Sequence, residues 1–433
     1  MVLMLVVFFV LIAAMGRLCE KTWVNPLTLF SMIFAVVSFL ASFGLYNMKS
    51  VSSTPYIIIG VGVISFAIGY LAYYSRPVKI RLRNHGTVTE KDYICREWLF
   101  KVFMIISVVA WCIIAVMTMG ELLSGIPYKV VRDNYGRSFS ENPLFTSPFV
   151  NFVVKWILVP MVHVIIAKIA YSIFDKHYTK YYYIGAIVIL AAYVFSTGSR
   201  IILLYTVVQI LFLFFVKEKG RRKKFNLGKK LKRGIKLAII AAVVTIVVVT
   251  MFRPSTVGST TSTVATIYAY GSVAVPLLDH WVEYVDALGA RTHGMAFIFG
   301  ILQWLARLKF PMPSAYYECA ELISYCSDTS IAVFGSNVYN AFDTVFFYFY
   351  LDFGYIGVAV ESIIFGLLTS GMYRIVRRKQ NEFMTIMFLI FLIAVTGSFA
   401  RWQFTTAPYI MMYVLVRILY RKKKQNLITQ GIE

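Results

Sequence analysis

Charged residues are scarce in this 433-residue chain: only 15% of its positions are Asp, Glu, Lys or Arg, whereas 59% are hydrophobic. This shortage excludes a water-soluble globular protein and predicts a polytopic membrane protein. Cysteine and histidine are also rare, with five residues of each, and they form no metal-ligand pattern. The sequence lacks internal repeats, low-complexity linkers and a separable cytoplasmic domain. We therefore expect one integral-membrane domain over residues 1–433, without a metal or another cofactor.

Long apolar runs, in contrast, are abundant. A helix needs about 17 to 25 mostly apolar residues to cross a hydrocarbon core about 30 Å thick. Eleven runs fit this criterion, and the first lacks the flanks of a signal peptide. The predicted fold is all-α, a transmembrane helix bundle with its N-terminus outside and its C-terminus in the cytoplasm. The predicted spans are 1–16, 27–46, 55–74, 102–119, 149–173, 182–197, 200–216, 235–252, 354–373, 383–400 and 406–420.

The basic residues sort to one side of this bundle. Short loops rich in Lys and Arg stay in the cytoplasm, and this rule assigns 32 of the 43 basic residues to the inner face. The largest group forms a basic cytoplasmic loop at residues 217–236, which has a single aromatic residue and is flanked by spans. Contact with anionic membrane lipids explains such a loop better than nucleic-acid binding does, so we expect no nucleic-acid partner.

The outer side carries one large loop, residues 253–353, which is too long for a simple connection and is where we expect function. Three of its stretches are strongly apolar: 264–278, 295–308 and 331–351. We expect these stretches to form helices that lie on or dip into the outer leaflet.

Cys319 and Cys326 both belong to this outer loop, where an oxidising compartment could join them. If that stretch is helical, the two residues lie about 10 Å apart along the helix axis, which is too far for a disulfide. The sequence leaves both possibilities open.

Arginine is enriched among the eleven basic residues assigned to the outer side. Its planar, permanently charged group binds phosphate through paired hydrogen bonds, so the enrichment points to phosphate or pyrophosphate recognition. Arg200 lies between two predicted spans with almost no loop, where a charge costs on the order of 3 kcal/mol. Gly198 and Ser199 could offer backbone N–H groups near the start of the next helix.

Other outer arginines extend this hypothesis, with anchoring at the membrane surface and ion pairing as the alternative roles. Arg253 and Arg401 lie at the same predicted depth as Arg200, so the three could converge on one headgroup. The candidate phosphate ligands are Arg200, Arg253, Arg291, Arg401 and, more weakly, Arg132.

Two residues are candidate general bases. His293 lies in a glycine-flanked basic segment with Arg291, and histidine titrates near neutral pH. Asp352 lies where an outer aromatic belt meets the ninth predicted span. An inert loop histidine is the alternative for the first. The alternative role for Asp352 is structural. Gly354 permits a sharp start of the following helix, and Asp352 could cap the amino end of that helix.

A further acidic group lies at Asp279, Glu283 and Asp286, whose i, i+4, i+7 spacing puts the three carboxylates on one helical face. Crowded carboxylates can raise one another's pKa values and serve acid–base chemistry. A solvated polar face explains the same spacing, and both interpretations stay open.

Three segments resemble the bacterial oligosaccharide repeat-unit polymerases, the Wzy-type O-antigen and capsule polymerases. They are Thr-Gly-Ser-Arg at 197–200, His-Gly-Met-Ala-Phe at 293–297, and Asn-Val-Tyr-Asn at 337–340 leading to Tyr-Leu-Asp-Phe-Gly-Tyr-Ile-Gly at 350–357. The resemblance implies a bundle like that of GT-C-type glycosyltransferases in the bacterial cytoplasmic (inner) membrane. It also implies transfer of a growing glycan from undecaprenyl pyrophosphate to the nonreducing end of a new lipid-linked repeat unit.

In that role the expected partners are undecaprenyl-pyrophosphate-linked oligosaccharides, membrane lipids, a chain-length regulator and a flippase. The arginines would neutralise the departing pyrophosphate, while His293 or Asp352 would take the acceptor proton. A lipid-linked oligosaccharide ligase would use the same donor and differs in its acceptor. A polysaccharide flippase or other transporter would need charges along a central path, whereas Glu361 is the main ionisable group inside a predicted span.

Overall fold

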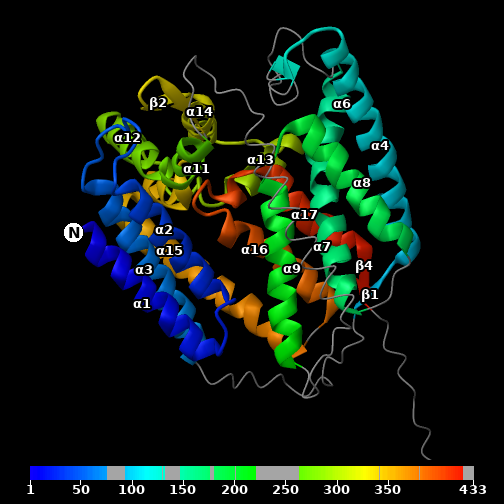
Figure 1. The fold of residues 1–433 in the computed structure, drawn as a ribbon, viewed down its shortest axis with the longest axis horizontal. Helices are drawn as coiled ribbons and strands as arrows, with labels where there is room; N and C mark the ends of the chain where they lie inside the picture. The colour runs from blue at the N-terminus through cyan, green and yellow to red at the C-terminus, as the bar shows by residue number, and fades with distance from the viewer. Residues whose placement is uncertain are drawn as a thin grey trace, which may run out of the picture. The chain divides into compact units, whose positions relative to one another are not determined.

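The computed structural model is helical through most of the chain (Figure 1). It describes residues 1–75, 93–128, 130–131, 147–175, 180–199, 201–220, 263–340, 342–379 and 381–422. Its α-helices are α1 (Val2–Glu20), α2 (Pro26–Ala41), α3 (Thr54–Ser75), α4 (Glu97–Leu123), α6 (Pro148–Val153), α7 (Val159–Asp175), α8 (Lys180–Thr197), α9 (Ile201–Gly220), α11 (Thr263–Ser272), α12 (Ala274–Ala287), α13 (Phe299–Arg307), α14 (Ser314–Asp328), α15 (Thr344–Lys379), α16 (Glu382–Thr396) and α17 (Ala407–Leu419).

Shorter elements connect or pair these helices. A π-helix, η1 (Val154–Leu158), joins α6 to α7, and a 3₁₀-helix, η2 (Gln403–Thr405), precedes α17. Strands β1 (Tyr93–Cys95) and β4 (Tyr420–Lys422) form one antiparallel pair. Strands β2 (Ile331–Phe334) and β3 (Asn337–Tyr339) form another.

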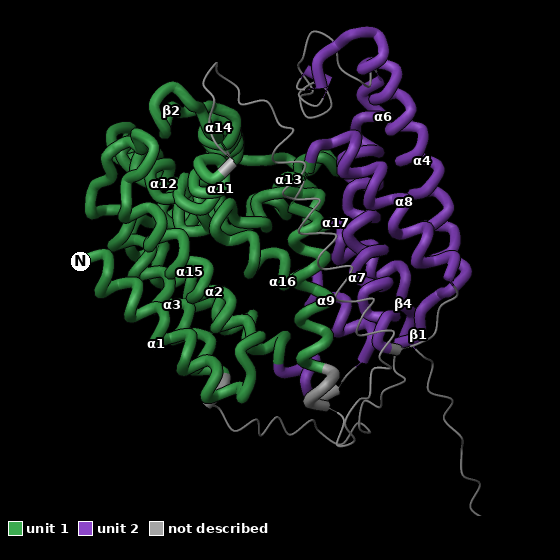
Figure 2. Tube along the Cα trace, viewed as in Figure 1, with its two compact units in different colours: residues 1–76, 199–373, 391–410 green, residues 77–198, 374–390, 411–433 purple. Residues whose placement is uncertain are grey.

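The chain divides into two compact units (Figure 2). Unit 1 consists of residues 1–76, 199–373 and 391–410. Unit 2 consists of residues 77–198, 374–390 and 411–433. Helices α15, α16 and α17 contribute residues to both.

In unit 1, α1, α2 and α3 pack against one another. The side chain of Asn25 accepts a hydrogen bond from the Thr28 N–H at 2.9 Å, and Pro26 fills the first helical position, so α2 begins there. The Thr28 hydroxyl donates to the Ala13 carbonyl of α1 at 2.9 Å. Phe30 of α2 stacks on Phe66 of α3 with ring centroids 3.9 Å apart, and aromatic rings continue from there into α15.

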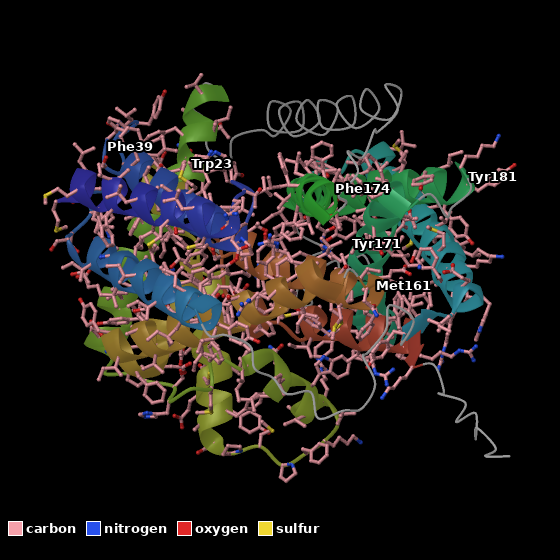
Figure 3. All side chains as sticks on the ribbon, turned by 90° about the horizontal axis from the view of Figure 1, so that it is seen from below. Trp23, Phe39, Met161, Tyr171, Phe174 and Tyr181 are labelled. Atoms are coloured by element: carbon pink, nitrogen blue, oxygen red, sulfur yellow. The ribbon has the colours of Figure 1, made fainter. Side chains whose placement is uncertain are left out.

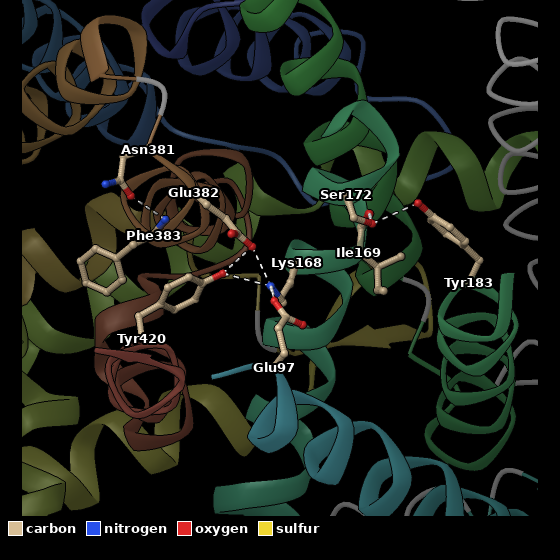
Figure 4. A network of polar contacts seen from close by, with 9 residues as sticks. All are labelled: Glu97, Lys168, Ile169, Ser172, Tyr183, Asn381, Glu382, Phe383 and Tyr420. Carbon is tan, nitrogen blue, oxygen red and sulfur yellow. Dashed lines mark hydrogen bonds and ion pairs between the residues drawn. The ribbon is translucent and has the colours of Figure 1, made fainter. Parts of the chain in front are cut away.

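In unit 2, α4, α7 and α8 pack together. The buried ammonium of Lys168 in α7 lies 2.7 Å from Glu382 Oε1 and 3.4 Å from Glu97 Oε1 (Figure 4). The Tyr420 hydroxyl donates to the same Glu382 oxygen at 2.7 Å. One lysine therefore ties the amino ends of α4 and α16 to α7 and to the strand pair β1–β4.

Helices coincide with ten of the eleven predicted spans, and the remaining run, 235–252, lies outside the described residues. Six described helical segments are long and apolar enough to cross a membrane: Val2–Glu20, Thr54–Tyr73, Glu97–Leu123, Pro148–Phe174, Lys180–Thr197 and Thr344–Arg377. Shorter apolar helices are Pro26–Ala41, Ile201–Val216, Glu382–Thr396 and Ala407–Leu419. The chain is thus a mostly helical, multi-pass membrane protein. The total of eleven spans and the likeness to GT-C-type enzymes stay predictions.

Large apolar side chains point away from many of these helices (Figure 3). In unit 1, Trp23 and Phe39 are exposed, and in unit 2 Tyr181 is exposed while Met161 and Phe174 are buried. Exposed apolar surface on this scale is unfavourable in water and matches contact with lipid.

The described part of the predicted outer loop, residues 263–340 and 342–353, is mostly helical, with one correction. Helices α11 and α12 cover the predicted stretch 264–278, and α13 lies within 295–308. The prediction of a continuous helix at 331–351 is wrong, because β2 and β3 form a hairpin there and α15 begins only at Thr344. Gly335, with φ 58°, makes the hairpin turn that a helix could not accommodate.

Candidate functional site

The longest helix, α15, bends sharply at Phe353 and Gly354. Phe353 has φ −142° and ψ 27°, and Gly354 has φ 62° and ψ −141°, so neither residue is helical. Side chains other than that of glycine are strained at this φ, which explains the glycine at 354. The bend lies where the sequence placed a sharp helix start, and it divides α15 into an outer segment, 344–352, and a longer segment from Tyr355 onward.

The buried carboxylate of Asp352 holds the segment 292–297 against this bend. Its hydrogen-bond donors are the Thr292 hydroxyl at 2.5 Å and the backbone N–H groups of Gly294, Ala296 and Phe297 at 2.8, 3.0 and 2.8 Å. Four donors stabilise the ionised form of a buried carboxylate. Asp352 therefore caps this loop segment, whereas the sequence suggested that it caps the helix after Gly354.

The other side of the segment rests on Trp402. The Trp402 indole N–H donates to the Phe297 carbonyl at 2.8 Å, and the two rings stack with centroids 5.3 Å apart. Gly300, at the start of α13, lies so close to η2 that an added Cβ would come within 2.6 Å of the Phe404 carbonyl oxygen. These contacts fix the path of the chain from Arg291 to α13.

Arg291 lies at the bend, where its guanidinium is oriented by two neighbours. Its Nη2 donates to Asp286 Oδ1 of α12 at 2.6 Å, and its Cζ lies 5.1 Å from the centre of the Tyr350 ring. The Tyr350 hydroxyl donates to the second oxygen of the same carboxylate at 2.8 Å. The Nε and Nη2 atoms lie 3.9 Å from the position that a Cβ would take at Gly354. The guanidinium is half-buried and faces the bend itself.

His293 lies beside this group, with its side chain exposed. Its backbone is in the left-handed region at φ 52°, and its N–H donates to the Asp352 carbonyl at 3.3 Å. The imidazole contacts the exposed Phe353 ring edge-on, with centroids 5.9 Å apart. Within the described residues the imidazole has no hydrogen-bond partner, so its nitrogens are open to solvent or to a ligand.

Apolar surface surrounds the same bend. Phe353, Tyr355 and Ile356 are 47%, 44% and 72% exposed. A cation, an exposed imidazole and an apolar surface therefore meet at the bend of α15, a helix that is long and apolar enough to cross a membrane. This combination matches a ligand with an anionic headgroup and an apolar tail.

A second polar group lies at the amino end of α15, and the sequence analysis missed it. Asp343 is fully buried and accepts a hydrogen bond from the Tyr348 hydroxyl at 3.4 Å. Burial raises the pKa of Asp343 to about 7, against the opposing effects of the Arg401 charge and of the Tyr348 and Trp281 side chains. The Trp281 indole N–H lies near the carboxylate but outside hydrogen-bonding geometry. The sequence feature that could have indicated this group is a single carboxylate, Asp343, inside the aromatic run 342–350.

The two described arginines among the predicted phosphate ligands thus lie in different surroundings. The positive charge of Arg401 acts on Asp343 near the amino end of the outer segment, where it lowers the pKa of that carboxyl against the effect of burial. Arg291 instead faces the bend at the carboxyl end of the segment, and the segment is roughly 13 Å long. Arg132, Arg200 and Arg253 lie outside the described residues, so their convergence stays a prediction.

Gly198 has a different role from the expected one. It ends α8 with φ 63°, and its N–H donates to the Val194 carbonyl at 2.9 Å. Because that N–H is already bonded, it is not offered to an anion. Ser199 follows it directly, between α8 and α9.

The remaining candidate residues from the sequence analysis also lie in separate surroundings. Asp279 of α12 accepts hydrogen bonds from the backbone N–H and the hydroxyl of Ser52, at 2.8 and 2.6 Å, so it does not share the contacts of Asp286. Cys319 and Cys326 are free thiols on the helix α14, and burial raises the pKa of each to about 12. The described residues contain no group of three or more His, Cys, Asp or Glu side chains that could hold a metal ion.

Comparison of the whole chain with known families, with curated proteins and with solved structures finds no match.

Proposed function

We propose that this protein is a glycosyltransferase that polymerises lipid-linked oligosaccharide repeat units at the outer face of a bacterial cytoplasmic membrane. The proposed reaction transfers the growing glycan from undecaprenyl pyrophosphate to the nonreducing end of a new lipid-linked unit. The observation that carries the proposal is the placement of Arg291. Its oriented guanidinium lies at the outer bend of α15 beside exposed apolar side chains, a combination suited to a lipid pyrophosphate.

In this proposal Arg291 binds the pyrophosphate that departs from the donor. A guanidinium has five N–H donors, and the contacts with Asp286 and the Ala290 carbonyl use two of them. The remaining donors suit a bidentate contact with phosphate oxygens. Because negative charge grows on the pyrophosphate as the sugar–phosphate bond breaks, a cation fixed in advance stabilises the transition state more than the ground state.

His293 is the favoured general base of the proposed reaction. It follows Arg291 by two residues, its imidazole is exposed, and its backbone is fixed by the Asp352 carbonyl. Asp352 is less suited to this role, since its two oxygens already accept four hydrogen bonds. We therefore assign Asp352 the role of holding the segment that carries Arg291 and His293.

The test uses the full-length protein in lipid nanodiscs with purified undecaprenyl-pyrophosphate-linked repeat units. A ladder of longer glycans is the expected product, and Arg291→Ala should abolish it. Arg307→Ala is the matched control, because Arg307 belongs to the same outer loop but lies in the last turn of α13. Folded protein that produces no ladder would overturn the proposal, as would normal elongation by the Arg291→Ala variant.

The same assay separates the ligase alternative. A reaction that contains a different glycolipid acceptor, without sugars of the repeat unit, should give no transfer by a polymerase. A ligase would instead attach single donor chains to that acceptor and produce no ladder from repeat units alone. The proposed partners, among them a chain-length regulator and a flippase, are omitted so that neither can supply the activity.

A further inference from the structure

Exposed basic residues gather on one face of the strand pair β1–β4 in unit 2. The register places Ile94 opposite Arg421, and directly opposed residues of an antiparallel pair point to the same face. Arg96 lies two positions after Ile94, and its N–H donates to the Leu419 carbonyl at 2.8 Å, so it continues the pairing on that face. Ile94, Arg96 and Arg421 are all exposed. We call this surface the β1–β4 basic face.

The opposite face of the strand pair is anchored in unit 2. Tyr420 is fully buried, and its hydroxyl donates to Glu382 Oε1 at 2.7 Å (Figure 4). The buried ammonium of Lys168 lies 2.7 Å from the same oxygen. The Tyr93 ring stacks on that of Phe383 with centroids 4.3 Å apart. These contacts hold the strands in place, so the backbone that carries the two arginines is positioned without a ligand.

The positive charge of the basic face is not neutralised by an acidic neighbour. In the part of the chain that the structure describes, Arg96, Arg421 and the exposed Lys101 of α4 form no ion pair. The exposed acid that follows Arg96, Glu97, lies 3.4 Å from the buried ammonium of Lys168 instead. The basic face and the start of α4 therefore offer guanidinium and ammonium donors to an anion.

Apolar surface begins directly beside these cations. Trp98, Val102 and Ile105 of α4 are 66%, 38% and 62% exposed, and their spacing of four and three positions places them on one face of the helix. Helix α17, which leads into β4, exposes Val414 and Ile418. Helix α4 is long and apolar enough to cross a membrane. A tryptophan between basic residues and an apolar stripe is typical of the level at which lipid headgroups meet acyl chains.

We propose that the β1–β4 basic face and the adjoining end of α4 form a binding site for an anionic phospholipid. The headgroup phosphate contacts Arg96 and Arg421, and Lys101 adds a third positive charge. The acyl chains lie along the apolar stripe that begins at Trp98. This site is independent of the proposed glycosyltransferase function, because none of its residues takes part in the proposed reaction.

The charge of the surface and its apolar border together select this ligand. A zwitterionic lipid carries a cation in the same headgroup as its phosphate, and the basic face repels that cation. Free phosphate suits the arginines but leaves the apolar stripe uncovered. An anionic lipid satisfies both parts of the surface. The topology predicted from the basic loops places residues 76–101 and 417–424 at the cytoplasmic leaflet, where anionic lipids are concentrated.

The test measures lipid binding to the purified full-length protein by native mass spectrometry. Dioleoylphosphatidylglycerol is the anionic probe and dioleoylphosphatidylcholine the zwitterionic one, and wild type should bind the anionic lipid at least about fivefold more tightly. Loss of one cation should weaken this binding about fivefold, so Arg96→Gln combined with Arg421→Gln should weaken it about twentyfold to thirtyfold. Lysine at both positions keeps the charge and should restore most of the affinity.

The matched control combines Arg17→Gln with Lys180→Gln, which removes two exposed basic residues of the same predicted side and should leave the affinity within about twofold. Thermal unfolding in phosphatidylcholine nanodiscs checks the fold, and each single arginine variant gives the same answer if the double variant unfolds. Equal weakening in the two double variants would overturn the proposal, as would equal affinity of wild type for both lipids. Displacement of the lipid by millimolar inorganic phosphate would assign the arginines to a soluble anion and would also overturn it.

Discussion

The Arg291 guanidinium and the Asp286 carboxylate are joined at 2.6 Å, and the same carboxylate accepts the Tyr350 hydroxyl at 2.8 Å. This bridge links α12 to the outer segment of α15 and fixes the direction in which Arg291 points. A cation fixed in this way loses little conformational freedom when an anion binds. The candidate site is therefore organised before any ligand arrives.

Asp286→Asn should weaken the interaction that orients the Arg291 guanidinium, without removing the arginine itself. We expect the KM for the lipid-linked donor to rise by about fivefold to twentyfold with a smaller change in kcat, because an oriented charge is lost from donor binding. Initial elongation rates at several donor concentrations give both constants. Glu283→Gln removes an exposed carboxylate from the same helix and should leave KM unchanged. An equal rise in both variants would indicate a general charge effect instead.

Asp352→Ala should free the segment 292–297. Three backbone N–H groups lose their acceptor, and each buried donor left unpaired costs about 1–3 kcal/mol, so we expect a loss of several kcal/mol in the free energy of unfolding. Hydrogen exchange at Gly294, Ala296 and Phe297 should accelerate at the same time. Asp352→Asn keeps an acceptor oxygen and should lose less. Unchanged exchange in the alanine variant would refute the role given to this carboxylate.

The raised pKa of Asp343 predicts that the stability of the folded protein depends on pH. Burial raises its pKa in the folded protein from 3.8 to about 7, so between these values the folded state holds a proton that the unfolded chain has released. The contribution of Asp343 to the free energy of unfolding is therefore complete at low pH and falls by about 1.4 kcal/mol per pH unit as pH rises toward 7. Thermal unfolding of wild type and Asp343→Asn across pH 5 to 8 measures the difference, which should level off above about pH 7. A difference that does not change with pH would contradict this assignment.

Gly354→Ala should destabilise the bend of α15 through the backbone alone. The added Cβ would meet only Arg291 atoms at 3.9 Å, an ordinary contact, but φ 62° with ψ −141° costs a non-glycine residue about 1–3 kcal/mol. The control is Gly120→Ala in α4, where a Cβ enters open space and should be neutral or slightly stabilising. Thermal unfolding in detergent compares the two variants. A similar stability of both would show that residue 354 does not need its positive φ.

Much of the secondary structure could be predicted because hydropathy is a local property. Ten predicted spans coincide with helices, and the change of backbone direction falls at Gly354, where the sequence offers the residue suited to it. The hairpin at Ile331–Tyr339 was missed because a short apolar run fits a strand and a helix equally well. The Gly335-Ser336 pair was the turn signal that could have separated them.

The candidate site was less predictable, because the role of each polar residue depends on which segments pack beside it. Arg291, His293 and Asp352 stood out in the sequence, but their neighbours did not. Asp352 and Gly294 are 58 positions apart, and no local pattern indicates that one accepts the hydrogen bond of the other. Asp343 was missed for the same reason, since its pKa depends on burial and on distant partners such as Arg401.

The sequence by itself determined the membrane class, the positions of most helices and the residue types that suit a phosphate ligand. These properties follow from composition and from apolar runs, which act over a single helix length. The tertiary structure alone decided that Asp352 holds a loop and that Asp286 orients Arg291. Hydrogen bonds and burial join residues that are distant in the chain, so only the folded protein specifies their partners.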